Sequence, residues 1–218
     1  SAAVAPGRDW RCTVRCWRCW AVRWRWKISR LLLLPDQIMP ATASRVAYEC
    51  GCAGAGAMDV SAGCTGFVYA LAMAAGAVAS GFQDHALVVG AEAISRLLDW
   101  EDRSTAVLFG DGAGAVVVSA AEAPAAGILG FDLGGDGRGD EFLLIPAGGS
   151  RLPASHATVD AREHYMRMNG HEVYKFATRV VADSARRVLK RCNRNVGDID
   201  LFVPHQANLR IIDAAAKK

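Results

Sequence analysis

Two periods of hydrophobic and polar positions run through residues 35–218. Short apolar runs that are bounded by Gly or polar residues predict buried strands. They are "GAMDV" (56–60), "HALVVGAE" (85–92), "TAVLFG" (105–110), "GAVVVSA" (114–120), "AGILGFDLGG" (126–135) and "DIDLFVP" (198–204). Apolar positions at helical spacing predict helices: a short one within 36–50, then 65–80, 169–192 and one from Asn208 onward. Because strands alternate with helices, the predicted class is α/β.

Composition and charge narrow the possible functions. The 218 residues are 52% hydrophobic, enough for one substantial core or two small ones. The apolar stretch 65–79 is short and contains Gly66, Tyr69 and Gly76, so we expect a buried core helix and no membrane span. Residues 31–218 carry a net charge of −4, which does not indicate a general nucleic-acid surface. Seven cysteines without a hydrophobic signal segment favour a reduced, cytoplasmic protein.

The N-terminal residues 1–34 differ from the rest of the chain. Residues 8–30 hold five of the six Trp and three of the seven Cys without a clear period, and residues 1–30 carry +7. Three interpretations stay open: a segment joined by a cloning or reading-frame artefact, which we favour, a Trp/Arg surface arm, or a metal site using Cys16 and Cys19. No second ligand pair follows, so we expect no metal. We therefore predict two regions, 1–34 and 35–218.

Cys64 is the first candidate for chemistry. It follows Ser61-Ala62-Gly63, where the predicted strand ends and the helix begins. A helix N-terminus favours a thiolate and offers N–H groups to a carbonyl oxygen, and the small neighbours leave room for a ligand. A buried structural cysteine is the alternative for a lone Cys.

His205 is the second candidate. It follows the apolar run that ends at Val203 and precedes the last predicted helix. Ligands of open α/β sheets bind beyond the carboxyl ends of the strands, so an imidazole at this junction is well placed for catalysis. A structural histidine is the alternative, and Asn208 is equally consistent with a helix N-cap.

The loop "FGDGAGA" (109–115) also has two interpretations. It lacks the lysine of a phosphate-binding loop and the glycine spacing of a dinucleotide site. A tight turn between two strands is therefore favoured over a phosphate cradle.

Five sequence blocks resemble one enzyme family in the same order. They are "DVSAGCTGFVYAL", "RLLDWEDRSTAVLFGDGAGAVVV", "RGDEFL", "MNGHEVYKFA" and "DIDLFVPHQANLRIIDAAAKK". From about Pro35 to Lys218 the chain resembles β-ketoacyl-acyl-carrier-protein synthase III, a condensing enzyme of fatty-acid biosynthesis. The resemblance implies a homodimer with the thiolase-like fold, layered α-β-α-β-α, of which this chain would hold the end of the first half and the start of the second.

The same resemblance implies roles for individual residues. Cys64 would take an acetyl or short branched acyl group from coenzyme A, and His205 would stabilise the enolate formed when malonyl-acyl-carrier protein loses CO2. Further contacts follow from the matched motifs: Arg103 at the adenine end of coenzyme A, Asn208 on the pantetheine side, Phe109 and Ile94 in the acyl pocket, Gly170 and Tyr174 as other substrate contacts, and Arg210 in carrier-protein docking. Coenzyme A enters as a thioester substrate, so no cofactor is expected, and neither is binding to nucleic acid or membrane.

Departures from the family keep other functions open. The family's third catalytic residue, an Asn in a "GNTSA" segment, has no counterpart in residues 35–218, so we expect this chain alone to be impaired in condensation. A truncated, non-catalytic subunit that acts through dimerisation is one alternative. A Cys/His hydrolase is another, although it would need an Asn or Asp to orient His205.

Overall fold

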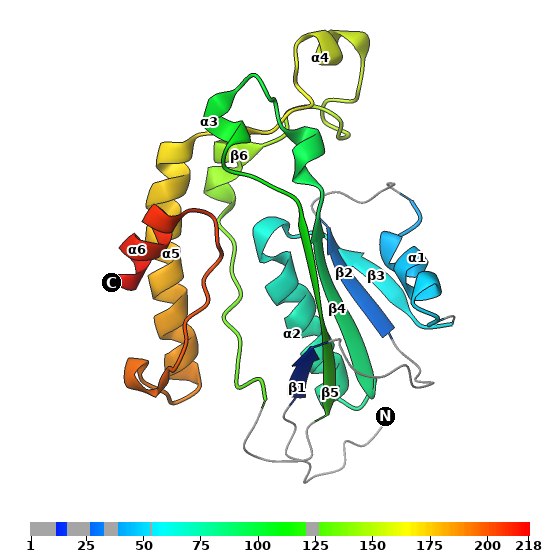
Figure 1. The fold of residues 1–218 in the computed structure, drawn as a ribbon, viewed down its shortest axis with the longest axis vertical. Helices are drawn as coiled ribbons and strands as arrows, with labels where there is room; N and C mark the ends of the chain where they lie inside the picture. The colour runs from blue at the N-terminus through cyan, green and yellow to red at the C-terminus, as the bar shows by residue number, and fades with distance from the viewer. Residues whose placement is uncertain (1–11, 17–26, 33–38, 53, 121–126) are drawn as a thin grey trace. The chain divides into compact units, whose positions relative to one another are not determined.

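The computed structural model describes residues 12–16, 27–32, 39–52, 54–120 and 127–218 (Figure 1). These residues form two compact units. The first comprises residues up to 93 together with 112–129, and the second comprises 94–111 together with 130–218. Each unit is built from its own elements.

A five-stranded mixed sheet forms the first unit, with the strand order β1-β5-β4-β2-β3. The strands are β1 (Cys12–Cys16), β2 (Lys27–Leu32), β3 (Ala57–Val60), β4 (His85–Glu92) and β5 (Gly112–Ala120). Strand β2 pairs in parallel with both β3 and β4, whereas β5 pairs antiparallel with β4 and β1. The predicted strands at 56–60, 85–92 and 114–120 are therefore confirmed.

The N-terminal region contributes two of these strands. β1 and β2 lie within residues 1–34, where the sequence showed no period, and they pair with strands of residues 35–218. The reason is that backbone hydrogen bonds, unlike side-chain patterns, require no particular residue type. A boundary at residue 34 stays a prediction, and the suggested metal ligand Cys19 lies outside the described residues.

Helices cover both faces of the sheet (Figure 1). On one face α1 (Thr42–Glu49) packs Ala43 and Ala47 against Leu87, with Val89 beside them. On the other face lies α2 (Gly66–Ala79), which follows the short 3-10 helix η1 (Gly63–Thr65). One side of α2 is buried, whereas Val68 and Met73 are about half exposed, so the predicted core helix is buried along one face.

The second unit is mainly helical. Its helices are α3 (Arg103–Ala106), α4 (His156–Asp160), α5 (Gly170–Arg191) and α6 (Leu209–Ala216), with 3-10 segments η2 (Ile94–Leu97), η3 (Gly137–Phe142) and η4 (Val196–Asp198). Strands β6 (Leu143–Leu144) and β7 (Arg167–Met168) form a two-stranded antiparallel sheet. Helix α6 packs against α5. The long amphipathic helix and the last helix are confirmed.

The predicted strand at 105–110 is wrong. Residues 103–106 form α3 because Asp102 caps its N-terminus: the carboxylate accepts hydrogen bonds from the Ser104 backbone N–H at 3.0 Å and from the Thr105 hydroxyl at 2.7 Å. The glycine-rich loop therefore joins a helix to β5 and is not a turn between two strands. Within that loop, Asp111 accepts hydrogen bonds from the Ser95 N–H at 2.8 Å and from its hydroxyl at 2.6 Å.

The predicted strand at 126–135 is also wrong for its described part, residues 127–135. This segment is held by a side chain instead of by a neighbouring strand. Asp132, whose side chain is 6% exposed, accepts hydrogen bonds from the Ser184 hydroxyl at 2.7 Å and from Arg187 at 2.8 Å, and it pairs with Arg191 at 3.1 Å. These contacts attach the segment to α5, and the Arg187 hydrogen bonds, followed by the Ser184 bond, lower the pKa of Asp132.

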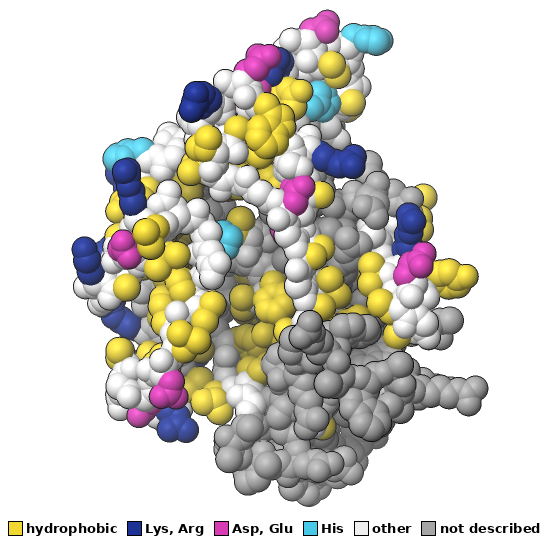
Figure 2. Space-filling model, viewed as in Figure 1, with side chains coloured by type: hydrophobic (Ala, Val, Ile, Leu, Met, Phe, Trp, Pro, Cys, Tyr) yellow, Lys and Arg dark blue, Asp and Glu magenta, His cyan; other side chains and the backbone are white. Residues whose placement is uncertain are grey.

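The predicted strand at 198–204 is the third error. After η4, residues 199–206 adopt no regular structure, and Leu201 and Val203 are 78% and 69% exposed. An apolar run becomes a strand only when a neighbouring strand accepts and donates its backbone hydrogen bonds. Figure 2 shows hydrophobic side chains on the surface together with Lys and Arg side chains.

Candidate active site

Cys64 lies at the strand-to-helix junction that the sequence predicts. β3 ends at Val60, and Cys64 is the middle residue of η1, directly before α2. Gly63 has a φ of +55°, a left-handed conformation that glycine adopts without strain. The Thr65 hydroxyl donates to the Ala62 carbonyl at 2.8 Å and stabilises the turn. The local sequence therefore holds the thiol at the start of a 14-residue helix.

The pKa of the Cys64 thiol shifts in the direction opposite to the expected one. Although the residue is exposed, the protein atoms around its sulfur partly desolvate it and raise the pKa, and the negative charge of Glu92 raises it further. A hydrogen bond from the backbone N–H of Cys64 acts in the lowering direction but does not dominate. Burial and the charge of Glu92 thus oppose the effect expected from the helix N-terminus, and the nucleophilic role of Cys64 stays a prediction.

Glu92 is a candidate that sequence reasoning missed. It is the last residue of β4 and is half-buried. The available signal was a carboxylate at the end of the apolar run "HALVVGAE", where an open sheet places its functional groups.

His205 is an exposed side chain in the irregular segment that precedes α6. Three residues later Asn208 is the N-cap of α6, and its Oδ1 accepts a hydrogen bond from the Arg210 N–H at 2.8 Å. The capping role of Asn208 is therefore confirmed, while its predicted contact with pantetheine stays a prediction. Arg210 is exposed, so its guanidinium is accessible.

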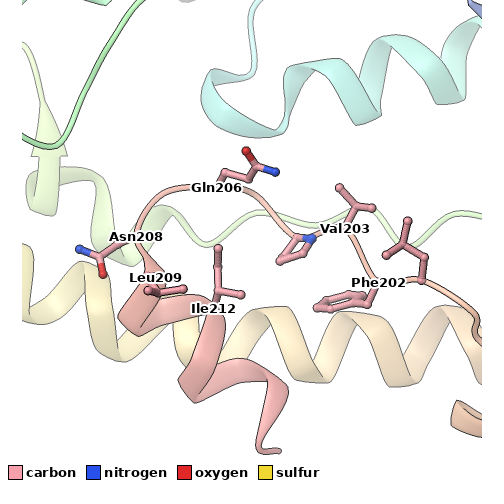
Figure 3. Close-up of a pocket in the computed structure, with 8 residues that line it drawn as sticks. Phe202, Val203, Gln206, Asn208, Leu209 and Ile212 are labelled. Carbon is pink, nitrogen blue, oxygen red and sulfur yellow. The ribbon is translucent and has the colours of Figure 1, made fainter.

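A mainly apolar pocket of about 430 Å³ is lined by residues that precede and follow His205 in the sequence. Figure 3 shows Ile212 on α6 directed toward the preceding loop, with Phe202 beside it, whereas Val203 and Gln206 point to the other side. The residues that line it are Leu201, Phe202, Val203, Pro204, Gln206, Asn208, Leu209 and Ile212. Of the predicted site residues only Asn208 lines this pocket, and its apolar lining was not predicted as a site.

The other predicted substrate contacts also lie in the second unit. Ile94 is buried in η2, Arg103 is the exposed first residue of α3, and Phe109 is half-buried in the loop after it. Gly170 begins α5, and Tyr174 follows one turn later with 39% exposure. Their roles stay predictions. Cys64 belongs to the first unit and His205 to the second, so their cooperation is a prediction as well.

Two properties of the described residues bear on alternative functions. Within the described residues, no group of three or more His, Cys, Asp or Glu side chains is arranged to hold a metal ion. Among the helices that the structure describes, none combines the length and the apolar character that crossing a membrane requires.

Fold and site together define a class. A mixed sheet with helices on both faces, and a cysteine between a parallel strand and the helix after it, is the arrangement of the thiolase-fold condensing enzymes. Residues 58–137, which include Cys64, match the family model described as 3-oxoacyl-[acyl-carrier-protein (ACP)] synthase III. The resemblance to β-ketoacyl-acyl-carrier-protein synthase III is thus confirmed over the matched part of the chain.

Individual relatives agree with this match. The β-ketoacyl-[acyl-carrier-protein] synthase III of Caldanaerobacter subterraneus subsp. tengcongensis is 50% identical over 184 residues, which are 84% of this chain and 55% of the relative. That of Natranaerobius thermophilus is 47% identical over 186 residues, covering 84% and 56%. The chain therefore spans about half the length of the curated relatives it matches.

Solved structures show the same fold. The 3-oxoacyl-(acyl carrier protein) synthase III of Pseudomonas aeruginosa has a TM-score of 0.79 and 44% identity, with 88% of this chain and 57% of that one covered. The synthase III of Thermus thermophilus has a TM-score of 0.79 and 43% identity, with 88% and 58% covered. The chain has part of the thiolase-like fold of these enzymes.

Proposed function

We propose that this chain is part of an acyltransferase that condenses a short acyl-coenzyme A primer with malonyl-acyl-carrier protein. The products are 3-oxoacyl-acyl-carrier protein, CO2 and coenzyme A, which begins fatty-acid biosynthesis. The observation that carries the proposal is the position of Cys64 between β3 and α2, inside the residues that match the synthase III family.

The first step is acyl transfer to Cys64. The sulfur, once deprotonated, attacks the thioester carbonyl of the primer, and the new C–S bond forms as the carbonyl oxygen takes the negative charge. Collapse of this intermediate breaks the original C–S bond, and coenzyme A leaves as a thiolate that takes up a proton. Backbone N–H groups at the start of α2 are suited to stabilise the transient oxyanion.

The second step is condensation. Malonyl-acyl-carrier protein loses CO2 and leaves an enolate, whose oxygen accepts a hydrogen bond from the His205 imidazole in this proposal. The enolate carbon attacks the acyl group on Cys64, and a new C–C bond forms as the thiol is released. Arg103, Asn208, Gly170, Tyr174, Phe109 and Ile94 bind the substrates, Arg210 contacts the carrier protein, and two copies of the full-length enzyme form a homodimer.

The proposed compartment is the cytoplasm. Cys50, Cys52, Cys64 and Cys192 are free thiols in the structure. Because a nucleophilic cysteine has to stay reduced, a reducing compartment suits the proposed chemistry.

Incubation with radiolabelled acetyl-coenzyme A tests the function. The expected result is label on Cys64, identified by peptide mapping, and none in a Cys64→Ser variant. Cys50→Ser is the matched control, because Cys50 is also an exposed thiol in the same unit and its loss leaves the expected label unchanged. Label that moves with Cys50 instead of Cys64 contradicts the proposal.

Addition of malonyl-acyl-carrier protein separates the alternatives. Loss of label from Cys64 with release of a 3-oxoacyl product supports condensation. Release of free acetate without a second substrate supports the hydrolase. A chain that takes no label and only associates with a full-length synthase is the non-catalytic subunit.

A further inference from the structure

The side chain of Glu92 lies on the same face of the sheet as α2. Side chains along a strand alternate between faces, and Leu87 and Val89 of β4 pack on the α1 face. Gly90 is on the other face, since a Cβ placed on it would lie 3.4 Å from the Phe67 ring of α2. Glu92 is two residues beyond Gly90 and therefore shares that face.

Glu92 and Cys64 also lie at the same edge of the sheet. Leu31 of β2 is the register partner of both Val60 in β3 and Gly90 in β4, so these two residues are level across three parallel strands. The chain leaves β3 just after this level and enters η1 with Cys64, while β4 ends at Glu92. The shared face and the shared edge of the sheet thus place the Glu92 carboxylate near the Cys64 thiol.

Among their described side chains, the neighbouring elements β3, β5 and α2 place no second charge on this face of the sheet. Asp59 of β3 faces α1, where its carboxylate accepts hydrogen bonds from the Thr42 N–H at 2.8 Å and the Ala43 N–H at 2.9 Å. The sequences of α2 and β5 contain no charged residue, and Tyr69 is the titratable side chain of α2. Among the described side chains of β3, β4, β5 and α2, Glu92 is thus the charge that faces Cys64.

We propose that Glu92 restrains the reactivity of Cys64 by keeping its thiol protonated. A protonated thiol is a poor nucleophile and resists oxidation, which suits an exposed cysteine that has to stay reduced. In this proposal Glu92 does not touch the substrate; it acts only through Cys64 and is therefore called a positioning residue. The inference deepens the proposed function and rests on it for the role of Cys64. The raised pKa of Cys64, to which burial and then the Glu92 charge contribute, is consistent with it.

The test is the pH profile of iodoacetamide alkylation at Cys64, followed by peptide mass mapping in the full chain. Glu92→Gln removes the charge and keeps the shape, and it is expected to lower the alkylation midpoint by about half a pH unit or more. At neutral pH the rate then rises about two-fold, because the larger thiolate fraction is partly offset by lower intrinsic nucleophilicity. A midpoint that does not change in Glu92→Gln overturns the proposal.

Two control variants separate charge from structure. Glu92→Asp keeps the carboxylate and is expected to keep the unmodified profile. Asp84→Asn removes a carboxylate just before the opposite end of β4, roughly 26 Å away at about 3.3 Å per residue, and is expected to change nothing. An equal shift in Asp84→Asn would mean that net charge, not Glu92, sets the midpoint.

A measurement on the unmodified protein keeps the test decisive if Glu92→Gln fails to fold. Salt at about 1 M shortens the screening length to about 3 Å and is expected to lower the midpoint by part of the shift seen in Glu92→Gln, because a half-buried pair is screened less than an exposed one. A midpoint that is independent of salt contradicts the proposal. Alkylation needs no acyl-coenzyme A, so the two proposals can fail separately. If the midpoint does not shift but acetyl label still reaches Cys64, only the role of Glu92 is rejected. If the midpoint shifts as expected but no acetyl label reaches Cys64, only the acyltransferase function is rejected.

Discussion

The sheet of the first unit and the C-terminal segment of the second unit differ in how completely they bury their apolar residues. In the first unit, strands β4 and β5 lie between two helical layers, and Val78, Val88 and Val118 are at most 1% exposed. In the second unit, α5 and α6 bury mainly small residues, while Leu201, Val203 and Leu209 are 69–78% exposed. The first unit therefore holds Cys64 on a closed framework, and the second carries His205 on a segment without strand pairing.

This difference shows what a candidate catalytic residue requires from its surroundings. Cys64 is positioned by the end of a paired strand, a turn with its own hydrogen bond and the start of a helix. His205 is positioned by the cap of α6 on one side only. Chemistry that depends on Cys64 alone should therefore be less sensitive to changes in the second unit than chemistry that needs both residues.

The largest expected effect comes from replacing Cys64 and His205 by alanine, each in a separate variant. Cys64→Ala is expected to abolish acyl labelling, because no other atom replaces the attacking sulfur. His205→Ala is expected to leave the label on Cys64 within about two-fold, since removal of a group that acts only in a later step does not slow the first. Rates of label incorporation from acetyl-coenzyme A measure both. A His205→Ala variant without label would show that acylation also depends on the second unit.

A matched pair of leucines tests the packing difference itself. Leu87→Ala removes a side chain that is 3% exposed and is expected to cost about 2–5 kcal/mol in the free energy of unfolding. Leu201→Ala removes one that is 78% exposed and is expected to change it by less than about 0.5 kcal/mol. Urea denaturation of each variant gives these values. Equal losses would mean that residues 199–203 are buried in solution.

The carboxylate of Asp132 provides the next smaller effect. Asp132→Asn is expected to lower the free energy of unfolding by about 1–2 kcal/mol at neutral pH, a range kept small because Arg187 and Arg191 are more than half exposed. The folded pKa of Asp132 is lowered, so its contribution is complete above the unfolded value of about 3.9 and is lost as the pH falls through the folded value. Denaturation as a function of pH is the measurement, and the difference between variant and parent should disappear in acid.

The smallest expected effect concerns the cap of α6. Asn208→Ala removes the hydrogen bond to the Arg210 N–H and is expected to cost about 1 kcal/mol. Asn208→Asp is the matched control, because its carboxylate accepts the same bond and suits the positive end of the helix. Thermal unfolding followed by circular dichroism compares them. If both variants are equally destabilised, Asn208 has a role besides capping.

Most elements could be predicted because their signals are local. The helical spacing of α5, the apolar runs of β4 and β5, and the small residues around Cys64 lie within single segments of the chain. The site could be predicted to the same extent: the junction at Cys64 and the cap at Asn208 follow from neighbouring residues. Errors arose where a local pattern competed with a side-chain contact, as when Asp102 turned the start of a predicted strand into α3.

The sequence by itself thus determined the α/β class, the place of Cys64 between strand and helix, and the resemblance to the synthase III family. Only the tertiary structure decided that residues 12–16 and 27–32 join the sheet, that residues 198–204 form no strand, and that the charge of Glu92 acts on Cys64. The physical reason is the same in each case. Strand pairing and electrostatic interactions depend on which residues distant in sequence become neighbours in space, and no local pattern contains that information.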